Sequence, residues 1–480
     1  MTASWLAGEI AVIGLGKSGR AALDVLRELG AQPDGYDRKL PTTGDRADGI
    51  FIGSDSEQVK RIRERHYDLA ILSPGVPPHS PVWKQLRDKG VPVWGEVELA
   101  WRVQQHLEKN IDWLTVTGTN GKTTTVSLLG SMLAAADKKY GVVGNVGTPI
   151  INVVAHDDVD VLAVELSSFQ LETTMSVEPL AAVCLNVDSD HLDWHGSADA
   201  YARAKARVYE NTRIAAVYDA SEPSIEKMVA EADVIEGARA IGYTLGIPPI
   251  AHLGIVDNHF VDRAFISHRH RQALALATVD DMMSYAGAHP SVALVKDTLA
   301  AMTLARAYGV EADAIAEGMR QFTPAAHRRH ILGAVADMVW IDDSKATNTH
   351  AAAASLAGFP PRSVIWVAGG DAKGQDFHSL VQTIEPVLRG VVVIGADPTP
   401  IVKALSARAP DVPFVVVDGH DDFMYSVVNE AVALSRPGDT VVLAPACASW
   451  DQFENYGQRG TAFAEAVDRL RQAWMGGGDA

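Results

Sequence analysis

The segment with the clearest chemistry reads TGTNGKTT over residues 117–124, after an apolar run and before a helical pattern. Glycines let backbone N–H groups close around phosphates, a lysine at the helix start reaches the β- and γ-phosphates, and a threonine hydroxyl can hold Mg²⁺. The match to the standard phosphate loop is imperfect, because Val116 stands where a glycine is expected. An ordinary glycine turn is the alternative. The Gly-Lys-Thr sequence at a strand-to-helix junction favours a phosphate loop.

Acidic and basic side chains accompany the next apolar runs. The run 161–164 ends in Glu165, and a carboxylate at the end of a strand can bind Mg²⁺. Residues 190–196 read DHLDWHG after another apolar run, which suits metal or phosphate binding, although a polar surface loop has equal weight. Lys205 lies in a helical pattern, and its spacing alone favours a solvent-exposed lysine.

Two polar segments follow strand-like runs near the C-terminal end. Residues 342–348 read DDSKATN, which places carboxylates, an ammonium and hydroxyls where an α/β fold binds its ligands. Residues 446–453 read ACASWDQF after the apolar run 440–443. Cys447 is a weak candidate for a nucleophile because no histidine is tied to it by a pattern. A small buried cysteine is the favoured interpretation.

Near the start of the chain, Gly14, Gly16 and Gly19 follow the apolar run 10–13, and Asp37 lies about 20 residues further on. This spacing is a weak indication of NAD binding, with Asp37 on the ribose. The same turn can hold any pyrophosphate, including that of a UDP-sugar.

The 480 residues correspond to about three domains at roughly 150 residues each. Apolar runs alternate with helical patterns, which predicts an α/β protein with open, mostly parallel sheets. We place the domains at 1–112, which is Rossmann-like, 113–323, which is of the phosphate-loop ATPase type, and 324–480, a further α/β domain. Within the second, residues 243–289 contain short β-like runs and are expected to form a small subsheet or an insertion.

Composition excludes several classes of protein. The formal net charge is −18, from 42 basic and 60 acidic residues, which argues against nucleic-acid binding. The two cysteines, Cys184 and Cys447, are too few for a disulfide framework and indicate a reducing compartment. No signal peptide and no membrane span are recognisable, so a cytoplasmic protein is expected.

Taken together, these motifs resemble those of the Mur ligases over almost the whole chain. The ATP loop is shared with folylpolyglutamate synthases, whereas GNVG at 144–147, ELSSFQ at 165–170 and DHLD at 190–193 are closer to the family. DSKATN at 343–348 and SWDQF at 449–453 resemble the members that add D-glutamate. The resemblance implies ATP-dependent ligation of D-glutamate to UDP-N-acetylmuramoyl-L-alanine through an acyl phosphate, by a monomer in peptidoglycan precursor synthesis.

The resemblance also implies a set of site residues. The nucleotide would contact Gly118, Thr119, Asn120, Gly121, Lys122, Thr123, Thr124, Arg328 and Asp343. The other substrates would contact Gly16, Ser18, Asp37, Ser73, Asn145, His191, Lys345, Thr347, Ser449 and Tyr456. Lys345, Ser449 and the backbone around Tyr456 would receive the D-glutamate carboxylates.

The same resemblance implies the metal and catalytic residues. Mg²⁺, expected as two ions, would be bound by Thr123, Glu165, His191 and Lys205, with Lys205 carbamylated by CO₂. Catalysis would depend on Lys122, His191, Lys205, Asp343 and Lys345. Asp343 and His191 are both open as the base that takes the amine's proton.

Two positions depart from the family's pattern, and three other functions compete. Lys296-Asp297 lies at an expected Asn-rich helix start, which affects adenine and ribose contacts, and Arg38-Lys39 replaces expected uracil-site residues. A folylpolyglutamate synthase-like ligase has no reason to contain the two D-glutamate motifs. An NAD-dependent oxidoreductase leaves the loop at 117–124 unexplained. A non-enzymatic nucleotide sensor would not need the intact polar residues beside that loop.

Overall fold

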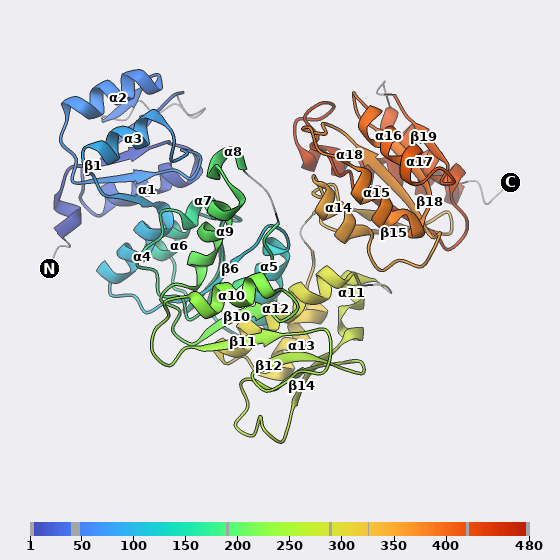
Figure 1. Cartoon of the computed structure of the whole chain (residues 1–480), viewed down its shortest axis with the longest axis horizontal. Coiled ribbons are helices and arrows are strands. Elements are labelled where there is room, and N and C mark those ends of the chain that lie inside the picture. The colour runs from blue at the N-terminus through green and yellow to red at the C-terminus, as the bar shows by residue number, and fades with distance from the viewer. Residues whose placement is uncertain are drawn as a thin grey trace. The chain divides into compact units, whose positions relative to one another are not determined.

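The computed structural model describes residues 4–39, 49–188, 192–287, 290–324, 326–418 and 422–476. It contains three β-sheets with helices packed on them (Figure 1). The chain divides into two compact units. One holds residues up to 279 together with 296–319, and the other holds 280–295 together with the residues from 320 onward.

The first sheet lies at the start of the first unit and is parallel throughout, in the order β3-β2-β1-β4-β5. Its strands are β1 (Ile10–Ile13), β2 (Asp34–Asp37), β3 (Ile50–Ile52), β4 (Leu69–Leu72) and β5 (Val93–Gly95). Its helical segments are η1 (Ser4–Ala7), α1 (Lys17–Glu28), α2 (Asp55–Glu64), α3 (Pro81–Asp88) and α4 (Glu96–His106). The strand order reverses between β1 and β4, and in open α/β sheets ligands bind at such a reversal, outside the carboxyl ends of the strands.

The second sheet has nine strands in the order β14-β13-β12-β11-β10-β9-β6-β8-β7. They are β6 (Asp112–Thr117), β7 (Tyr140–Gly144), β8 (Val161–Glu165), β9 (Ala181–Cys184), β10 (Ala215–Asp219), β11 (Arg239–Tyr243), β12 (His252–Val256), β13 (His259–Asp262) and β14 (Leu274–Thr278). The strands from β7 to β12 pair in parallel, and β13 and β14 are antiparallel. Residues 243–289, expected to form a small subsheet or an insertion, therefore extend the main sheet, with β12 parallel to β11 and with β13 and β14 antiparallel.

Helices connect the strands of this sheet and continue after it. They are α5 (Lys122–Ala135), α6 (Ile150–His156), α7 (Ser168–Leu171), α8 (Leu192–His195), α9 (Ala198–Ala206), η2 (Arg207–Tyr209), α10 (Pro223–Glu231), η3 (Val279–Met282), α11 (Met283–Ala286), α12 (Val292–Tyr308) and α13 (Ala312–Gln321). α5 is apolar on several sides because it is covered twice. It packs on the sheet, and Gly318 of α13 lies against the backbone of Met132.

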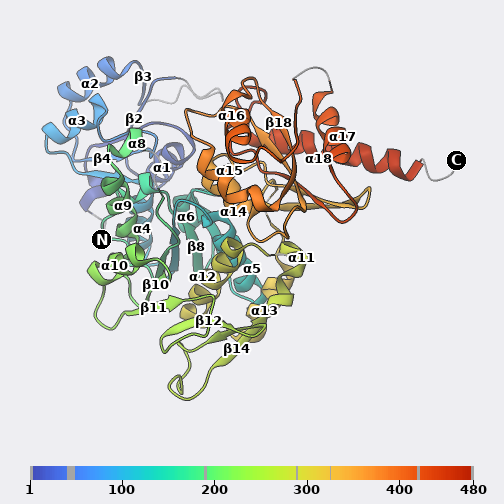
Figure 2. The ribbon, with the colours of Figure 1, turned by 45° about the vertical axis from the view of Figure 1, so that its right-hand side comes forward.

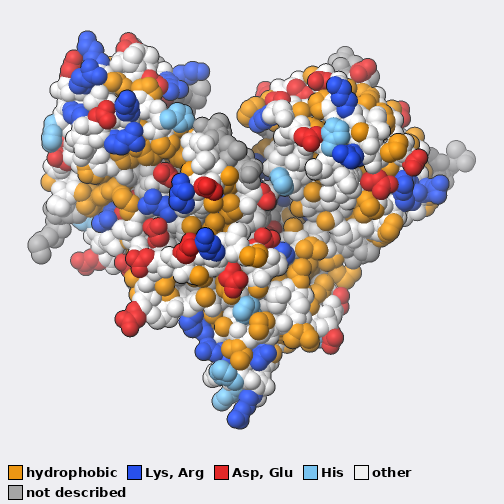
Figure 3. Space-filling view, viewed as in Figure 1, with side chains coloured by type: hydrophobic (Ala, Val, Ile, Leu, Met, Phe, Trp, Pro, Cys, Tyr) orange, Lys and Arg blue, Asp and Glu red, His pale blue; other side chains and the backbone are white. Residues whose placement is uncertain are grey.

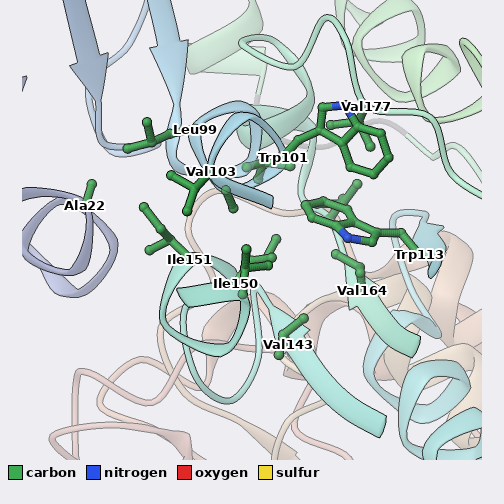
Figure 4. Packing of buried hydrophobic residues seen from close by; sticks show 14 of the residues in the cluster. Ala22, Leu99, Trp101, Val103, Trp113, Val143, Ile150, Ile151, Val164 and Val177 are labelled. Atoms are coloured by element: carbon green, nitrogen blue, oxygen red, sulfur yellow. The ribbon is translucent and has the colours of Figure 1, made fainter. Parts of the chain in front are cut away.

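One apolar core joins the first sheet to the second within the first unit (Figure 4). Trp101 of α4 meets Trp113 of β6 edge to face, with ring centroids 5.4 Å apart. Ile150 and Ile151 of α6 lie in the same cluster and are fully buried. α4 therefore packs as part of the interior of the second sheet, although it follows the last strand of the first.

The third sheet lies in the second unit, in the order β15-β16-β20-β17-β18-β19, with β15 alone antiparallel to its neighbour. Its strands are β15 (His330–Val335), β16 (Met338–Asp342), β17 (Val364–Gly369), β18 (Leu388–Ile394), β19 (Phe414–Val416) and β20 (Thr440–Leu443). Its helices are α14 (Thr349–Leu356), α15 (His378–Ile384), η4 (Glu385–Val387), α16 (Thr399–Arg408), α17 (Phe423–Leu434) and α18 (Tyr456–Gly476). α14, α15 and α16 cover one face, and α17 and the long α18 cover the other (Figure 2).

The α/β class with three sheets is confirmed, and the strands expected from apolar runs are present. The exact limits at 112/113 and 323/324 stay a prediction. None of the described helices is long and apolar enough to cross a membrane. On the face in Figure 3, acidic and basic side chains are interspersed, as expected for a protein of moderate negative charge.

Candidate active site

The phosphate-loop sequence forms a tight turn between β6 and α5. Gly121 is the residue before α5 and has φ +85°, a left-handed conformation that favours glycine. Lys122 begins the helix and turns back over the loop, donating to the carbonyl oxygens of Gly118 at 2.8 Å and Thr119 at 3.0 Å. Its ammonium therefore lies where the phosphates of a nucleotide would enter.

Asn186, just after β9, holds this loop from the side. Its Oδ1 accepts hydrogen bonds from the backbone N–H groups of Thr119 at 3.0 Å and Asn120 at 2.9 Å, and its Nδ2 donates to the Asn120 carbonyl at 3.2 Å. Sequence reasoning missed Asn186. Asn186 follows an apolar run, as Glu165 does, and this position was the one indication in the sequence. A single amide forms no motif with its neighbours, so the pattern did not single it out.

Asp297 of α12 packs against Gly121, the residue before α5. A Cβ atom on Gly121 would lie 2.2 Å from Asp297 Oδ1, so only glycine fits there. The neighbouring Lys296 is drawn away by Asp219, 2.7 Å from its Nζ, and by Ser221. The departure from an Asn-rich helix start thus places a carboxylate directly beside the phosphate loop.

A hydroxyl and a carboxylate meet next to the loop. Thr123 Oγ1 donates to Glu165 Oε2 at 2.6 Å, and Asn145 Nδ2 donates to Glu165 Oε1 at 2.9 Å. Glu165 is 2% exposed, so its carboxylate is fixed by these two partners. Hydroxyl and carboxylate oxygens are the ligands that Mg²⁺ takes, with phosphate and water completing the octahedron. Thr123 and Glu165 therefore fit the expected ion.

Lys205 is 1% exposed, so the interpretation as a solvent-exposed helix lysine is wrong. Its Nζ donates to the Gly118 carbonyl at 2.7 Å and lies over the Tyr201 ring at 4.7 Å. Tyr201 in turn contacts Thr119, with 3.0 Å between the two hydroxyl oxygens. The buried amine of Lys205, on α9, thus contacts the phosphate loop. α9 follows β9, and β9 and β8, which ends in Glu165, lie on opposite sides of β6 in the sheet.

The histidine motif between β9 and α9 is only partly visible. His191, expected to bind metal and substrate, lies outside the described residues. His195 stacks on Phe169 at 5.6 Å with an interplanar angle of 17°, and its Nε2 lies 2.9 Å from Ser168 Oγ. The ELSSFQ segment therefore supports this loop as well as the end of β8.

In the first sheet, the expected UDP residues gather at the carboxyl ends of β1, β2 and β4. Gly16 is the residue before α1, and Ser18 is half-buried in the first turn of that helix. Asp37 Oδ2 accepts from the backbone N–H of Leu15 at 2.6 Å, so this carboxylate shapes the glycine turn. Ser73 lies against Gly14 on the other side of the turn.

Two basic side chains near this turn have partners in the structure. Lys17 Nζ donates to the carbonyl oxygen of Gly147, which links the turn to the GNVG loop of the second sheet. Arg38 forms a bidentate ion pair with Asp55, with both N–O distances 2.6 Å. Arg38 is therefore paired with Asp55 of α2.

In the second unit, the D-glutamate motifs occupy the carboxyl ends of β16 and β20. Lys345 Nζ lies over the Tyr456 ring at 4.1 Å, and Ser449 is 2% exposed. The backbone N–H of Thr347 bonds to the Lys345 carbonyl at 2.8 Å, which curls this loop tightly. The structure thus brings Lys345, Thr347 and Tyr456 together, with Ser449 on the adjoining loop.

Asp343 lies beside two arginines and Cys447 is buried nearby. Burial raises the pKa of the Asp343 carboxyl, while Arg329 and Arg328 act in the opposite direction. The backbone N–H of Arg329 donates to Asp343 Oδ1 at 3.1 Å. Cys447 is 1% exposed, which agrees with the favoured interpretation of a small buried cysteine, and burial raises the pKa of its thiol to about 12.

A phosphate loop on a parallel sheet, with a carboxylate and a buried lysine beside it, defines a nucleotide-dependent α/β enzyme. The Mur ligase middle domain model matches residues 116–252, and the model "Mur ligase, glutamate ligase domain" matches residues 327–447. The chain belongs to the Mur ligase family.

Relatives match it over nearly its full length. A UDP-N-acetylmuramoylalanine–D-glutamate ligase of Streptomyces coelicolor is 46% identical over 471 residues, covering 96% of this chain and 98% of its own. The enzyme of the same name from Leifsonia xyli is 41% identical over 496 residues, covering 99% of this chain and 94% of its own. These matches include the segments around both D-glutamate motifs.

Solved structures share the fold. The UDP-N-acetylmuramate-alanine ligase MurC of Thermotoga maritima has a TM-score of 0.53 at 17% identity, covering 96% of this chain and 99% of its own. MurF of Acinetobacter baumannii has a TM-score of 0.55 at 16% identity, covering 95% and 90%. At this identity the likeness concerns the architecture alone.

Proposed function

We propose that this chain ligates D-glutamate to UDP-N-acetylmuramoyl-L-alanine, using ATP and releasing ADP and phosphate, in peptidoglycan precursor synthesis. The observation that carries the proposal is the match to two UDP-N-acetylmuramoylalanine–D-glutamate ligases, which are 46% and 41% identical over nearly the full length of the chain. The intact Lys345 and Ser449 loops at the ends of β16 and β20 agree with it. The protein acts as a cytoplasmic monomer.

The UDP group binds at the strand reversal between β1 and β4. The free backbone N–H groups at the start of α1, after Gly16, face a pyrophosphate, and Ser18 adds a hydroxyl. Ser73 closes the other side. Asn145, which is held by Glu165, and the Lys17–Gly147 contact extend this site toward the phosphate loop within the same unit.

ATP binds on the loop from Gly118 to Thr124. Lys122 leaves its carbonyl partners to neutralise charge developing on the γ-phosphoryl group as it moves to the substrate carboxylate. Thr123 and Glu165 would hold Mg²⁺, which supplies charge neutralisation between the phosphates and the carboxylate. Arg328 and Asp343 are the further nucleotide contacts that the resemblance implies. Asn186 keeps the loop in shape throughout.

Lys205 becomes a carbamate. Its neutral Nζ attacks CO₂, a nitrogen–carbon bond forms, and one proton leaves to water. Lys205 is 1% exposed and its Nζ lies 2.7 Å from the Gly118 carbonyl, so a carbamate formed there would lie beside the phosphate loop. The new oxygens would join His191 at a second Mg²⁺. Lys205→Ala should lose activity and regain part of it with a small added carboxylic acid; an unaffected variant, or a free amine by mass, contradicts the carbamate.

The amide forms in two steps. Transfer of the γ-phosphoryl group makes an acyl phosphate, because a carboxylate alone is a poor electrophile. The free amine of D-glutamate then attacks the acyl carbon, the C–O bond to phosphate breaks, and the amine's proton goes to Asp343 or His191. Lys345, Ser449 and Tyr456 hold the amino acid so that its amine faces that carbon.

The test of the function is phosphate release with UDP-N-acetylmuramoyl-L-alanine, ATP and a panel of amino acids. Phosphate release should require all three substrates, with D-glutamate as the amino acid. A preference for glutamate added to a folate would favour the folylpolyglutamate-like alternative. Reduction or oxidation of NAD would favour the oxidoreductase, and binding of nucleotide without any release would favour the sensor.

Lys345→Ala should raise the KM for D-glutamate by about 100-fold or more, since a charge-assisted contact to a carboxylate is worth about 3 kcal/mol. Turnover should also fall, because a misplaced amine attacks slowly. The KM for ATP should stay within about threefold. Steady-state kinetics with each substrate varied in turn measures this. An unchanged KM and kcat for D-glutamate removes Lys345 from the site.

A further inference from the structure

Arg459 of α18 is a buried arginine whose hydrogen-bond partners, among the described residues, are a hydroxyl and carbonyl groups and include no carboxylate. It is 1% exposed and is among the largest fully buried side chains of the described residues. Burial lowers the pKa of its guanidinium to about 10, so the group is still charged at neutral pH. A buried charge destabilises a fold unless hydrogen bonds compensate it, so the partners of Arg459 indicate its role.

All five N–H groups of Arg459 have acceptors, and the acceptors lie at the carboxyl ends of three different strands or in the loops that follow them. Two are Ser344 Oγ at 3.0 Å and the Ser344 carbonyl at 2.9 Å. Two more are the carbonyls of Cys447 at 3.1 Å and Ala448 at 3.3 Å. The last is the Gly369 carbonyl at 3.4 Å, at the end of β17. The guanidinium thus ties together the loops that follow β16, β20 and β17.

These partners are the immediate neighbours of the expected D-glutamate receptors. Ser344 precedes Lys345, Ala448 precedes Ser449, and Tyr456 lies one helical turn before Arg459 on α18. Ser344 Oγ also donates to the Tyr456 carbonyl at 2.8 Å. One guanidinium therefore joins three segments that are also linked in pairs by backbone bonds, from the Ala446 N–H to the Ala346 carbonyl at 2.9 Å and between Asp371 and Ala448 in both directions. Gln375 makes a further link, accepting from the Thr349 N–H and donating to the Ala446 carbonyl.

A second row of bonds continues beneath Lys345. Asp342 Oδ1 accepts from the Ser344 N–H at 2.9 Å, and Asp342 Oδ2 lies 2.6 Å from His327 Nδ1. The His327 carbonyl accepts from the backbone N–H of Lys345 at 3.1 Å. Gly460 leaves room for His327, since a Cβ there would come within 2.1 Å of the ring. The Lys345 backbone is therefore held from both sides.

We propose that Arg459 is a positioning residue for the amino-acid substrate, fixing the distances among Lys345, Ser449 and Tyr456 without touching the ligand. The inference rests on the proposed function, which places D-glutamate at those three residues. Arginine is required because its planar fork presents five donors at fixed angles, whereas lysine has three donors on one flexible atom. A lysine at this position would keep the positive charge but would leave some of the five acceptors without a hydrogen bond.

The test is Arg459→Lys in the full-length protein, with kinetics for all three substrates. We expect the KM for D-glutamate to rise about 10- to 100-fold, and the KM values for ATP and the UDP substrate to stay within about threefold. Ser344→Ala, which removes one acceptor and the Tyr456 contact, should change the KM for D-glutamate in the same direction by a smaller factor.

Arg389→Lys is the matched control. Arg389 pairs with Asp439 near the amino ends of β18 and β20, the opposite end of the same sheet. Arg389→Lys should lower the melting temperature without a selective change in the KM for D-glutamate. If Arg459→Lys does not fold, Ser344→Ala decides alone.

The outcomes separate the two proposals. A selective rise in the D-glutamate KM supports the positioning role. An equal loss for all substrates, or a loss that only follows melting temperature as in Arg389→Lys, overturns it. Wild-type protein that does not use D-glutamate at all overturns the proposed function and this inference together.

Discussion

Lys122 bonds to the carbonyls of its own loop, which keeps its ammonium at the phosphate entrance before any nucleotide arrives. Lys122→Ala should lower kcat by about 100-fold or more, since loss of one donor to developing transition-state charge costs roughly 3 kcal/mol. Lys139→Ala, which breaks only an exposed ion pair with Asp158, is the control. A kcat for Lys122→Ala within about tenfold of the parent would remove this role.

Glu96 is a buried carboxyl whose titration should be visible in stability. Burial raises the pKa of Glu96 from 4.5 to about 7. The backbone N–H groups of Ile151, which lies 2.8 Å from Oε1, and of Ile150 act in the opposite direction and lower this pKa. The native state therefore keeps a proton that the unfolded chain releases. Stability linked to Glu96 is fully present below pH 4.5 and is lost as pH rises through 7, by up to about 3 kcal/mol.

Glu96→Gln should remove this loss, so that the melting temperature of the first unit falls less between pH 5 and pH 8 than in the parent. Melting curves at several pH values provide the measurement. Parallel curves for the parent and Glu96→Gln would show that Glu96 does not titrate in this range.

At the scale of elements, the chemistry depends on strand ends that meet helix starts. Gly121 combines a left-handed φ with a close contact to Asp297. Gly121→Ala should destabilise the first unit by about 1–3 kcal/mol and raise the KM for ATP. Gly237 has φ +98° but no atom within 4 Å of its would-be Cβ, so Gly237→Ala measures the backbone cost alone. Equal effects of the two substitutions on stability and ATP binding would contradict a contact with Asp297.

The sequence predicted the parallel strands and the polar loops at their ends, because apolar runs and glycine turns are local signals. It also placed Glu165 beside Thr123. It did not predict Asn186, Tyr201 or Arg459, whose partners lie far along the chain. Lys205 was misjudged from spacing, since the helix face of a short segment does not reveal what covers it. Such contacts depend on sheet order, which local patterns do not encode.

At the scale of the whole molecule, two compact units should respond to ligands separately. The expected UDP residues of the first sheet all lie in the first unit. UDP at about 100 times its Kd should stabilise that unit by about 2.7 kcal/mol and leave the other unit's transition unmoved. Calorimetry with and without UDP measures this. Ser18→Glu, which puts an anion at the start of α1, should abolish the shift; a single transition, or equal shifts of two, would contradict separate units.

The packing of α4 has a consequence for recombination between homologues. Trp101 and Val103 belong to the interior shared with Trp113 and Ile150, while the chain between α4 and β6 is short (Figure 4). A chimera joined between residues 106 and 112 would pair one parent's α4 with the other parent's α6 and β6, mismatching a close-packed core. A crossover before Gly95 keeps α4, α6 and β6 from one parent, although residues of the first sheet such as Val12 still pack in the same core. The segment that should come from the same parent as the second sheet therefore begins at α4, one helix before β6.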